Sequence, residues 1–600
     1  MYDKLNEQQL QAVLHPYGPL LVLAGAGSGK TSTLTTRIAH LISEGTPPEA
    51  ILAVTFTNKA ADEMLARVAK MTGLDTHGMW VSTFHSACLR ILRRYAQLVG
   101  LNNGFSILDD SEQLSLVKKV LKELQDQDTD PKEALESISR AKNELLDLDN
   151  PIYQAYQEKL RQSNSVDFDD LIKKTVELFQ ANPRVLEWFQ KKFQHILVDE
   201  YQDTNYAQHM LIDFLAHKHR NIFVVGDPDQ SIYGWRGARL ENMFEFIKRY
   251  QPAVVKLERN YRSTETILSA ANTLILNNED RLEKELWTDQ GGGAPVSLFE
   301  AGDDREEGSF VAGRIKRLVR EGHKLKDFAV FYRTHAQSRP IEEALSRAQI
   351  PYVVVSGTGF FGHKEIKDLL AYLKCIVNPA NVPALQRVLD APKRGIGPKA
   401  FDQIFQHGME NQKFIVDALC LNVPGLGGKA KKAANELGQL FQEWREWQGT
   451  VPELIRDVVS RSGLGEHYEE EPERVQRLFE LASSAEGATN LQEFVDRVSL
   501  ISEADKHGDV DAVRLMSLHA AKGLEFPVVF LTGLEEGVFP RGRDRLEEER
   551  RLCYVGLTRA MERLFLTYSR SRLIYGTYQN NGVSRFVREI GGQLSEVAGF

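Results

Sequence analysis

The stretch Leu20–Thr31 constrains the fold of this 600-residue chain more than any other. Five apolar residues of strand type run into a loop with glycine at every second position, which closes with Gly-Lys-Thr. A helical pattern follows from Ser32 to Leu41. Glycines let the backbone approach a polyphosphate, and the helix that begins here adds its positive dipole end. The stretch therefore predicts a phosphate-binding loop, in which Lys30 meets the outer phosphates and the Thr31 hydroxyl a Mg²⁺ ion. An ordinary glycine-rich turn with a surface lysine is the alternative.

Length and composition indicate a soluble protein of several packed units. The chain exceeds what one hydrophobic core holds, and its 42% hydrophobic and 26% charged residues are typical of globular proteins. The N-terminus is polar, and Leu20–Ala24 is too short to span a membrane, so we expect a cytosolic protein without a signal peptide. The net charge of -9 argues against coating nucleic acid through bulk positive charge but leaves a locally basic groove open. Disulfides and structural zinc are not expected, because the four cysteines are far apart: Cys88, Cys375, Cys420 and Cys553.

Two carboxylates follow a later apolar strand. His195–Val198 runs directly into Asp199 and Glu200. A phosphate loop needs such a pair, with Asp199 to hold Mg²⁺ through water and Glu200 to orient and deprotonate the attacking water. Acidic pairs are common on surfaces, but this one comes directly after the apolar residues Ile196, Leu197 and Val198. We interpret it as the hydrolytic pair.

Other predicted strands also end in polar residues. Ile51–Thr55 precedes Phe56 and Asn58, and Trp80–Ser82 precedes His85. Strands that alternate with helices predict a parallel α/β sheet whose ligands lie along this edge. Simple helix caps explain each of these signals equally well. Gln9, in a short helix before the glycine loop, has the donor and acceptor that reading an adenine edge requires, although a surface glutamine is the plainer interpretation.

The loop Gly226–Gly237 joins a polar strand end to two aromatic residues. Gln230 lies at the strand end, where it could sense a γ-phosphate. Tyr233 and Trp235 do not belong to a periodic apolar face, so we expect at least one of them to be exposed. Exposed aromatics beside Arg236 suit stacking with nucleic-acid bases. A role for Trp235 as a core anchor is the alternative.

We expect four parts in the chain. A second α/β unit begins near Val254 and includes the strands Phe328–Phe331 and Tyr352–Val355 and a helix from Lys364 to Val377. Two helix-rich inserts, the first without convincing strands, interrupt the sheets. The predicted division is a first lobe of residues 1–86 and 193–253, a first insert of 87–192, a second lobe of 254–379 and 511–600, and a second insert of 380–510.

The second insert contains two near copies of one short motif. Gly395–Ala400 and Gly425–Ala430 each place two alternate glycines and a lysine, Lys399 or Lys429, at the start of a helical stretch, and the second has one further glycine, Gly428. Such a turn can bind a DNA phosphate through backbone N–H groups. Plain loop-to-helix turns explain the motif about equally well.

Seven short motifs follow one another in a fixed order along the chain. They are Gly25–Thr31, Thr83–Ser86, Val198–Asp203, Gly226–Tyr233, Asn260–Ser263, His519–Phe526 and Tyr554–Ala560. In order and context, over nearly the whole chain, they resemble the motifs of the UvrD/Rep/PcrA helicases of superfamily one. The resemblance implies an α/β fold with two RecA-like lobes, each a parallel sheet flanked by helices and interrupted by a mostly helical insert. It implies ATP between the lobes, single-stranded DNA across their top and 3′→5′ translocation.

The resemblance also implies roles for individual residues. Gln9 would contact the adenine, Tyr261 would stack on it, and Glu525 would meet the ribose. The catalytic residues would be Lys30, Glu200, Gln230, Arg262 and Arg559, and the Mg²⁺ ligands Thr31 and Asp199. The nucleotide-binding set is completed by Ala24, Gly25, Ala26, Gly27, Ser28, Gly29, Ser32 and Arg37. The DNA-binding set would be Phe56, Asn58, His85, Tyr233, Trp235, Arg236, Arg333, His519, Lys399 and Lys429.

Two departures from the family pattern stand out. Family members often carry an arginine directly after Gly-Lys-Thr that completes a stack on the adenine, whereas this chain has Ser32. We therefore expect looser base selectivity. The chain also stops soon after the last predicted strand, without the basic tail of many relatives, which puts tail-mediated partners in doubt.

The leading hypothesis is an ATP-driven motor on single-stranded DNA and single-strand/duplex junctions. It would act as a monomer or weak dimer in a bacterial-type cytosol, associated with the nucleoid, with accessory repair or replication proteins as partners and no membrane contact. A helicase–nuclease subunit of RecB type is disfavoured, because no acidic metal cluster follows the final motif. A nucleotide-gated DNA-binding scaffold is disfavoured by the intact Lys30, Glu200 and both arginines.

Overall fold

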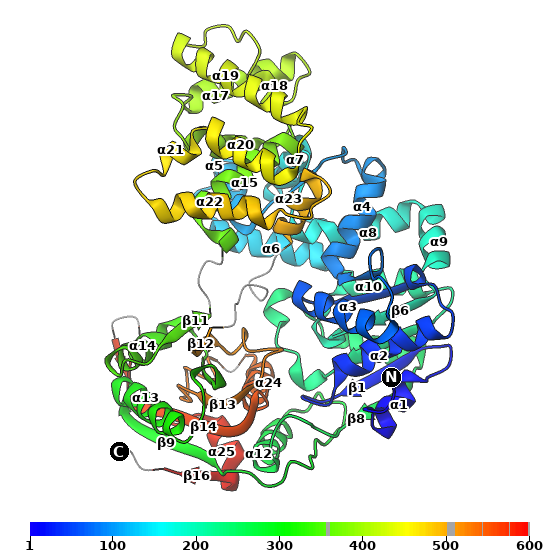
Figure 1. The fold of residues 1–600 in the computed structure, drawn as a ribbon, viewed down its shortest axis with the longest axis vertical. Helices are drawn as coiled ribbons and strands as arrows, with labels where there is room; N and C mark the ends of the chain where they lie inside the picture. The colour runs from blue at the N-terminus through cyan, green and yellow to red at the C-terminus, as the bar shows by residue number, and fades with distance from the viewer. Residues whose placement is uncertain (356–359, 501–509, 543, 575–576, 598–600) are drawn as a thin grey trace. The chain divides into compact units, whose positions relative to one another are not determined.

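The computed structural model describes residues 1–355, 360–500, 510–542, 544–574 and 577–597. The chain forms two compact units (Figure 1). Residues 1–83, 186–357 and 504–600 form a unit with two sheets, and residues 84–185 and 358–503 form a mostly helical unit. We call the two halves of the sheet unit the first lobe and the second lobe.

The first lobe is built on six parallel strands. Strands at the centre of this sheet are buried at every position, which is why they appear in the sequence as unbroken apolar runs. The order is β3 (Trp80–Thr83), β2 (Ile51–Thr55), β6 (His195–Val198), β7 (Ile222–Gly226), β1 (Leu20–Ala24) and β8 (Ala253–Leu257). The helices are α1 (Glu7–Val13), α2 (Lys30–Ser43), α3 (Asn58–Thr72), most of α9 (Pro183–Lys192), α10 (Tyr206–Ala216) and α11 (Glu241–Tyr250).

The topology of this sheet positions the site. Strands β6, β7 and β1 are neighbours and run in the same direction. Their carboxyl ends therefore meet at one edge, where β1 leads into the glycine loop, β6 into Asp199 and β7 into Asp227. Helices α1 to α3 cover one face of the sheet, with Leu34 and Ile38 of α2 packed against strand residues such as Val22.

Strand β8 corrects the predicted start of the second lobe. We placed that start at residue 254, but β8 pairs in parallel with β1 and is the edge strand of the first sheet. The error has a physical reason: an apolar strand pattern does not reveal with which sheet the strand pairs.

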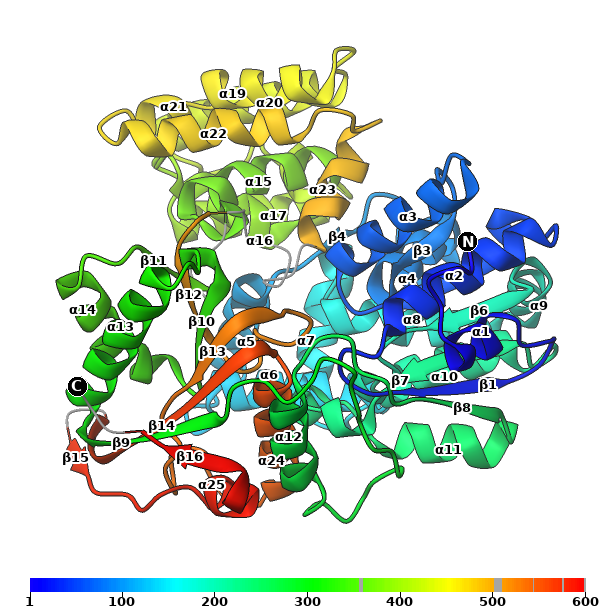
Figure 2. The same cartoon turned by 60° about the horizontal axis from the view of Figure 1, so that its bottom comes forward.

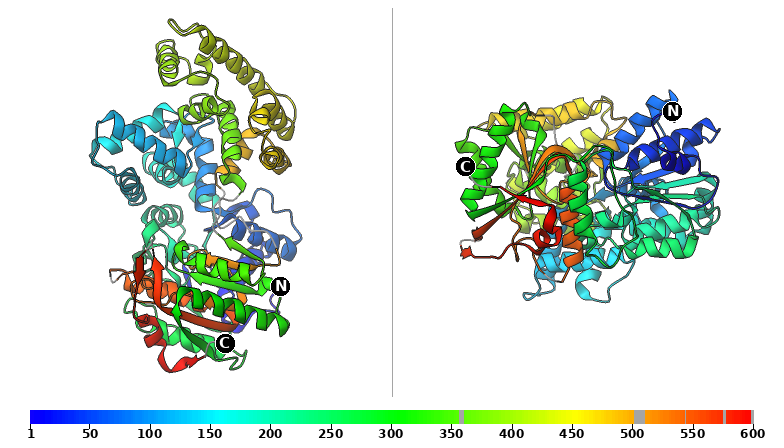
Figure 3. Two further views of the ribbon diagram at one scale, coloured as in Figure 1. Left: turned by 90° about the vertical axis from the view of Figure 1, so that its left-hand side faces the viewer. Right: turned by 90° about the horizontal axis from the view of Figure 1, so that it is seen from below.

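The second lobe is built on a second, mostly parallel sheet. Figures 2 and 3 show that each sheet combines distant parts of the chain, blue with teal strands in the first lobe and green with orange-red strands in the second. The order is β11 (Tyr352–Val355), β12 (Val513–Ser517), β10 (Phe328–Tyr332), β13 (Phe526–Leu531), β14 (Ala560–Ile574), β9 (Val296–Asp303) and β16 (Leu594–Glu596), and β15 (Thr577–Gln579) pairs antiparallel with β14.

Helices cover both faces of the second sheet. Helices α13 (Asp304–Arg320) and α14 (Ser338–Arg347) pack against one face, which includes Val330 and Phe530. Helices α12 (Glu265–Ile275), α24 (Leu546–Leu557) and α25 (Arg585–Ile590) pack against the other, which includes Phe331 and Val529. The predicted fold class, two α/β lobes with parallel sheets, is confirmed.

The helical unit begins with an insert that is not entirely helical. A short parallel pair joins β4 (Ser106–Ile107) to β5 (Ser165–Val166), whereas we expected no strands here. Two-residue strands are too short to leave a periodic pattern in the sequence. The helices are α4 (Phe84–Tyr95), α5 (Asp110–Glu123), α6 (Pro131–Asn143), α7 (Pro151–Gln162) and α8 (Phe168–Ala181).

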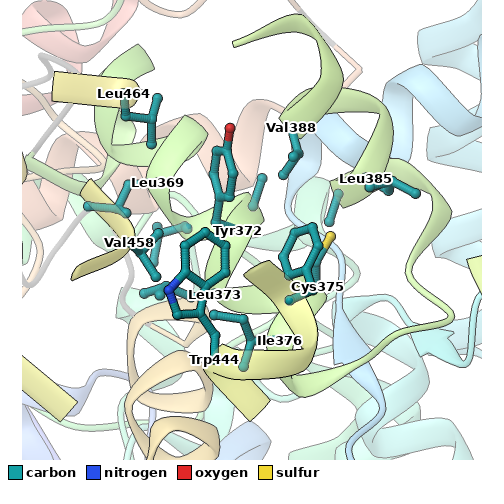
Figure 4. Packing of buried hydrophobic residues seen from close by; sticks show 14 of the residues in the cluster. Leu369, Tyr372, Leu373, Cys375, Ile376, Leu385, Val388, Trp444, Val458 and Leu464 are labelled. Carbon is teal, nitrogen blue, oxygen red and sulfur yellow. The ribbon is translucent and has the colours of Figure 1, made fainter. Parts of the chain in front are cut away.

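The rest of the helical unit surrounds a core of its own. Figure 4 shows Tyr372 and Cys375 in this core, together with Trp444 and Val458. Helix α15 supplies the first two, so it belongs to this unit and not to the second lobe, where we had placed it. The helices are α15 (Lys364–Val377), α16 (Val382–Asp390), α17 (Pro398–Glu410), α18 (Ile415–Ala418), α19 (Gly428–Arg445), α20 (Val451–Arg461), α21 (Leu464–His467), α22 (Pro472–Ser484) and α23 (Leu491–Ser499).

The predicted boundary of the first insert at residue 192 is also too late. The Phe193 ring lies 5.0 Å from the Trp80 ring of β3, and the Phe189 ring of α9 lies 6.2 Å from it. Residues from 186 onward therefore pack with the first lobe. The end of the predicted second insert falls on residues 501–509, which lie outside the described residues.

All four cysteines are free thiols. Among the described helices, none is long and apolar enough to cross a membrane.

Candidate nucleotide and DNA site

The glycine loop joins the end of β1 to the first residue of α2. Gly27 has a φ of 64° and Gly29 a φ of 85°, left-handed conformations that glycine adopts without strain. The Ser28 hydroxyl donates to the Gly25 carbonyl at 2.8 Å and closes the loop on itself. Helix α2 begins at Lys30, so its unpaired N–H groups face the loop. This is the backbone geometry of an anion site.

The segment that follows β8 rests directly on this loop. The Asn260 amide donates to the Ala26 carbonyl at 2.7 Å, and the Tyr261 N–H donates to the Gly27 carbonyl at 2.9 Å. A Cβ atom added to Gly27 would lie 2.6 Å from the Asn260 amide nitrogen and 2.8 Å from Cβ of Arg262. Asn260 is a site residue that we did not predict, and its place directly before Tyr261 and Arg262 is the signal that could have identified it.

The predicted hydrolytic pair lies at the same edge. Asp199 is buried, and its Oδ1 atom has no hydrogen-bond partner among the described residues. Burial, together with the neighbouring Glu200 charge, raises the pKa of Asp199 to about 7. An orphaned carboxylate oxygen beside a phosphate loop fits a Mg²⁺ ligand, and Thr31, half-buried in the first turn of α2, is the second candidate ligand.

Glu200 has a lowered pKa, in contrast to its neighbour Asp199. Its backbone is left-handed, with a φ of 50°, which is uncommon for a non-glycine residue and is often found at functional sites. Burial would raise the pKa of its carboxyl, but the Lys30 and Lys522 ammonium groups outweigh this and hold the pKa at about 2. Lys30 lies 3.6 Å from it and Lys522 3.7 Å. Glu200 is therefore ionised at neutral pH.

Lys522 comes from the second lobe and is a site residue that our prediction omitted. Its Nζ forms an ion pair with Asp203 and donates to the Gln230 carbonyl at 2.7 Å. Its side chain is only 8% exposed, so the charge of its ammonium group is balanced by these partners and hardly by water. The signal was present in the sequence, because this lysine stands in the glycine-containing turn after β12.

A second contact between the lobes joins Gln230 to Arg559. The Arg559 guanidinium donates to Oε1 of Gln230 at 3.1 Å, and the Gln230 amide donates to Asp227. Burial and the charge of Arg262 lower the pKa of Arg559 to about 9, which still leaves it protonated at neutral pH. The two residues that we predicted to approach a γ-phosphate from opposite lobes are thus in direct contact.

Arg262 and Glu525 are also brought together. Their side chains form an ion pair at 2.7 Å, and Arg262 donates to the Thr558 carbonyl at 3.1 Å. We predicted that Arg262 meets the γ-phosphate and Glu525 the ribose, and here each is the partner of the other.

The residues predicted to meet the adenine lie on the outer side of the loop. The Gln9 amide donates to the Ser28 carbonyl at 2.9 Å, and its oxygen accepts from the Asn6 N–H at 2.9 Å. The Asn6 side chain donates in turn to the Tyr261 hydroxyl at 2.9 Å. Tyr261 is 42% exposed. Asn6, which we did not predict, links Gln9 to Tyr261.

Arg37 does not belong with the nucleotide set. Its guanidinium donates to the Val13 carbonyl at 2.7 Å and lies 5.9 Å from the centre of the Phe223 ring. Only 4% of the residue is exposed. Arg37 lies almost two helical turns beyond Lys30, about 10 Å further along the α2 axis. Its guanidinium is held there inside the lobe by the Val13 carbonyl.

The loop Gly226–Gly237 carries the predicted DNA contacts. Trp235 is 53% exposed, which excludes the alternative of a core anchor. The Arg236 guanidinium lies 4.6 Å from the Trp235 ring centre, and the His519 ring of the second lobe meets the Trp235 ring edge-on at 6.1 Å. The Tyr233 hydroxyl donates to the His519 carbonyl at 3.3 Å.

A hollow of about 220 Å³ opens beside Trp235. Arg333 is paired there with Glu549 at 2.8 Å, and the Gly234 N–H donates to Glu548 at 2.9 Å. The predicted DNA contacts Trp235, Arg333 and His519 therefore share one depression. It is lined by Trp235, Arg333, His519, Arg545, Glu548, Glu549 and Leu552.

The remaining predicted DNA contacts are more dispersed. Phe56, which follows β2, and Asn58, the first residue of α3, are half-buried at the same sheet edge as the glycine loop. His85 lies in the helical unit, where its ring packs 4.1 Å from the Phe168 ring and burial lowers its pKa to about 3. Lys399 and Lys429 are exposed in the same unit.

Comparison with known proteins shows the family to which the chain is similar. A family model described as UvrD/REP helicase N-terminal domain matches residues 5–251, and one described as UvrD-like helicase C-terminal domain matches residues 255–422 and 427–571. The chain is 44% identical to the ATP-dependent DNA helicase PcrA of Bacillus subtilis (strain 168), over 99% of this chain and 86% of that protein. It is 41% identical to the protein of the same name from Staphylococcus aureus (strain MRSA252), over 99% of this chain and 87% of that protein.

Proposed function

The chain belongs to the UvrD/REP family of helicases, and from this premise we propose that it hydrolyses ATP where its two lobes meet and uses the energy to move along single-stranded DNA. The direction is 3′→5′, as in the family it resembles. At a junction this movement separates the strands of a duplex, and at a bound protein it strips that protein from the DNA.

One observation carries the proposal: charged side chains of both lobes converge on the phosphate loop. Lys522 and Arg559 of the second lobe contact Asp203 and Gln230 of the first, within reach of Lys30. A full set of charges around a γ-phosphate therefore depends on both lobes. An arginine supplied across an interface accelerates hydrolysis by about 10³–10⁵, so the approach of the lobes and hydrolysis become one event.

Each residue of the site has a distinct role in this proposal. The Lys30 ammonium neutralises the outer phosphates, and Arg262 and Arg559 stabilise charge on the γ-phosphate as its bond breaks. Glu200 accepts a hydrogen bond from the attacking water; because its pKa is low it is a weak base, and its main contribution is orientation. Asp199 and Thr31 would hold Mg²⁺, which supplies positive charge at the phosphate oxygens.

Stacking on Trp235 holds the DNA in this proposal. A base stacked on an aromatic ring contributes about 1–3 kcal/mol, independent of sequence. Because the Trp235 ring packs against His519 of the other lobe, the position of the Trp235 ring depends on the relative orientation of the two lobes. Nucleotide binding thereby changes the grip on the strand.

The proposal also covers the DNA substrate, the partner proteins, the oligomeric state and the location of the protein. Single-strand/duplex junctions are the preferred substrate, with Lys399 and Lys429 on the duplex. Accessory repair or replication proteins are the partners, and the active form is a monomer or weak dimer in the cytosol, associated with the nucleoid.

Unwinding of tailed duplexes tests the proposal. We expect ATP-dependent strand separation with a 3′ single-stranded tail and little with a 5′ tail, together with ATP hydrolysis that single-stranded DNA stimulates. Hydrolysis that DNA does not stimulate, without unwinding of either substrate, would favour the nucleotide-gated scaffold instead.

A tryptophan pair tests the DNA contact. Trp235→Ala removes the exposed ring, so unwinding should fall by about tenfold or more while ATP hydrolysis without DNA stays near wild type. Trp188→Ala is the matched control, because Trp188 of α9 is also partly exposed and is also covered by a cation, Lys192, at 5.2 Å. Equal losses in both variants would contradict the stacking role.

A further inference from the structure

An exposed stack of three side chains lies beside the phosphate loop. The Arg259 guanidinium lies 5.0 Å from the centre of the Tyr261 ring and 5.6 Å from the centre of the Trp287 ring. Asp289 forms an ion pair with the same guanidinium. Tyr261 is 42% exposed and Trp287 50% exposed. We call Trp287, Arg259 and Tyr261 the base platform.

The backbone builds this platform rigidly. Arg259 and Trp287 form a parallel bridge, in which the Asn260 N–H donates to the Trp287 carbonyl at 2.7 Å and the Trp287 N–H to the Glu258 carbonyl at 3.1 Å. The Gln290 side chain donates to the Tyr261 carbonyl at 3.0 Å. The order of the stack is thus set by paired backbone segments and not by flexible side chains alone.

The platform is also tied to the phosphate loop. The Tyr261 N–H donates to the Gly27 carbonyl, and a side chain at Gly25 would collide with Leu286, the residue before Trp287. These contacts place the Tyr261 residue directly beside the phosphate loop, where the proposed nucleotide site would bring a base within reach of its ring. The residue after Gly-Lys-Thr is Ser32, so α2 offers no guanidinium there.

We infer that Arg259, held by Trp287 and Asp289, determines the base preference of the nucleotide site by fixing and polarising the Tyr261 ring. The inference rests on the proposed ATP site. A cation on one face of an aromatic ring draws electron density from it and favours stacking of an electron-rich base on the other face. A purine presents a larger π surface than a pyrimidine, so it gains more from this platform.

Hydrolysis of two nucleotides by the full-length chain tests the inference. Arg259→Gln should raise KM for ATP by about two- to fivefold, the range of an exposed cation–π contact. KM for CTP and kcat for both nucleotides should stay near wild type. Arg339→Gln is the matched control, because Arg339 is an exposed arginine of α14 that is also paired with an acid, Glu343.

Further variants separate the role in base preference from a role in folding. Arg259→Lys keeps the charge near Asp289 but loses the planar guanidinium, so it should show a smaller change of the same kind. If Arg259→Gln lowers the melting temperature, Trp287→Phe keeps a ring and serves as the second test, with a smaller loss of ATP preference expected. A ratio of KM for ATP to KM for CTP that stays at the wild-type value in Arg259→Gln and Trp287→Phe overturns the inference.

A failure of the proposed ATP site would be distinguishable. In that case Tyr261→Ala would leave KM for every nucleotide unchanged, or the wild-type chain would hydrolyse none of them. An altered KM in Tyr261→Ala with an unaltered nucleotide ratio in Arg259→Gln would leave the ATP site standing and refute only the role of Arg259.

Discussion

Three glycine-rich turns in this protein lead into a helix with a lysine near its start, and they differ in what surrounds them. In the phosphate loop, a side chain at Gly27 would collide with Asn260 and one at Gly29 would lie 2.5 Å from the Gln9 amide. At Gly397 and Gly427, in the other two turns, an added Cβ would meet nothing within 4 Å. All three turns lead into a helix start, but Gly29 has a left-handed backbone whereas Gly397 and Gly427 are extended. Only the first turn is enclosed.

The difference shows what local geometry can and cannot do. A turn at a helix start binds one anion through its N–H groups, wherever it stands. Hydrolysis of ATP requires more than such a turn, because carboxylates such as Glu200 and cations such as Lys522 and Arg559 must reach the same point. The enclosed turn is therefore suited to hydrolysis, and the open turns at Lys399 and Lys429 are suited to holding a phosphate without reacting with it.

The largest expected effect is on the lysine of the enclosed turn. Lys30→Ala removes the charge that meets the outer phosphates, so DNA-stimulated ATP hydrolysis should become undetectable while the chain stays folded and binds single-stranded DNA. The matched Lys429→Ala should hydrolyse ATP like wild type. Turnover near wild type in Lys30→Ala would mean that the enclosed turn is not catalytic, and a colorimetric phosphate assay decides it.

The second effect concerns the cation that reaches the enclosed turn from the other lobe. Arg559→Lys keeps the charge but loses the planar fork that matches two phosphate oxygens, so turnover should fall by about 10³-fold with ATP binding retained. Arg563→Lys is the control, because Arg563 is four residues further on, 40% exposed and paired with Glu321 on the surface. If the two variants turn over alike, Arg559 is only a structural arginine. Single-turnover hydrolysis and nucleotide titration provide the measurements.

A pair of glycine substitutions compares the enclosed, left-handed turn with an open, extended one. Gly27→Ala forces a left-handed residue with a side chain against Asn260, so nucleotide affinity should fall by about tenfold or more. Gly427→Ala introduces the same methyl group at an extended residue in open space and should change neither stability nor affinity. Nucleotide titration and thermal melting of both variants check this, and equal behaviour would show that the two turns are interchangeable.

The smallest effect is expected at the open turns. The double variant Lys399→Ala, Lys429→Ala should bind duplex DNA more weakly, and the slope of log affinity against log salt should decrease by about two, because each lost phosphate contact releases about one counterion fewer. ATP hydrolysis should not change. An unchanged salt slope in a fluorescence-anisotropy titration would mean that these are plain turns.

Much of the site could be predicted because its signals are local. A strand that ends in glycines with Lys30, or in the pair Asp199 and Glu200, is visible in a short window of sequence, and the parallel sheet then requires the strand ends to meet. Arg37 shows the limit of such reasoning. It stands close to the loop in sequence, but its position on α2 turns it inward to the Val13 carbonyl.

Contacts between residues that are far apart in the sequence could not be predicted from local patterns. Asn6 and Tyr261 are 255 residues apart, and Lys522 and Asp203 are 319 residues apart. Nothing in the local pattern around any of them indicates its partner. Strand β8 and helix α15 were misplaced for the same reason, because an apolar face indicates burial but does not reveal against which element.

The sequence by itself determined the α/β class, the phosphate loop, the hydrolytic carboxylates and the family, because each depends on residue types at short and regular spacing. Only the tertiary structure decided that Trp235 is exposed, that Gln230 contacts Arg559, and that the Arg259 guanidinium lies against the rings of both Tyr261 and Trp287. These are contacts between segments that the chain brings together only when its sheets and helices pack. Their energy depends on distance and burial, which a linear sequence does not contain.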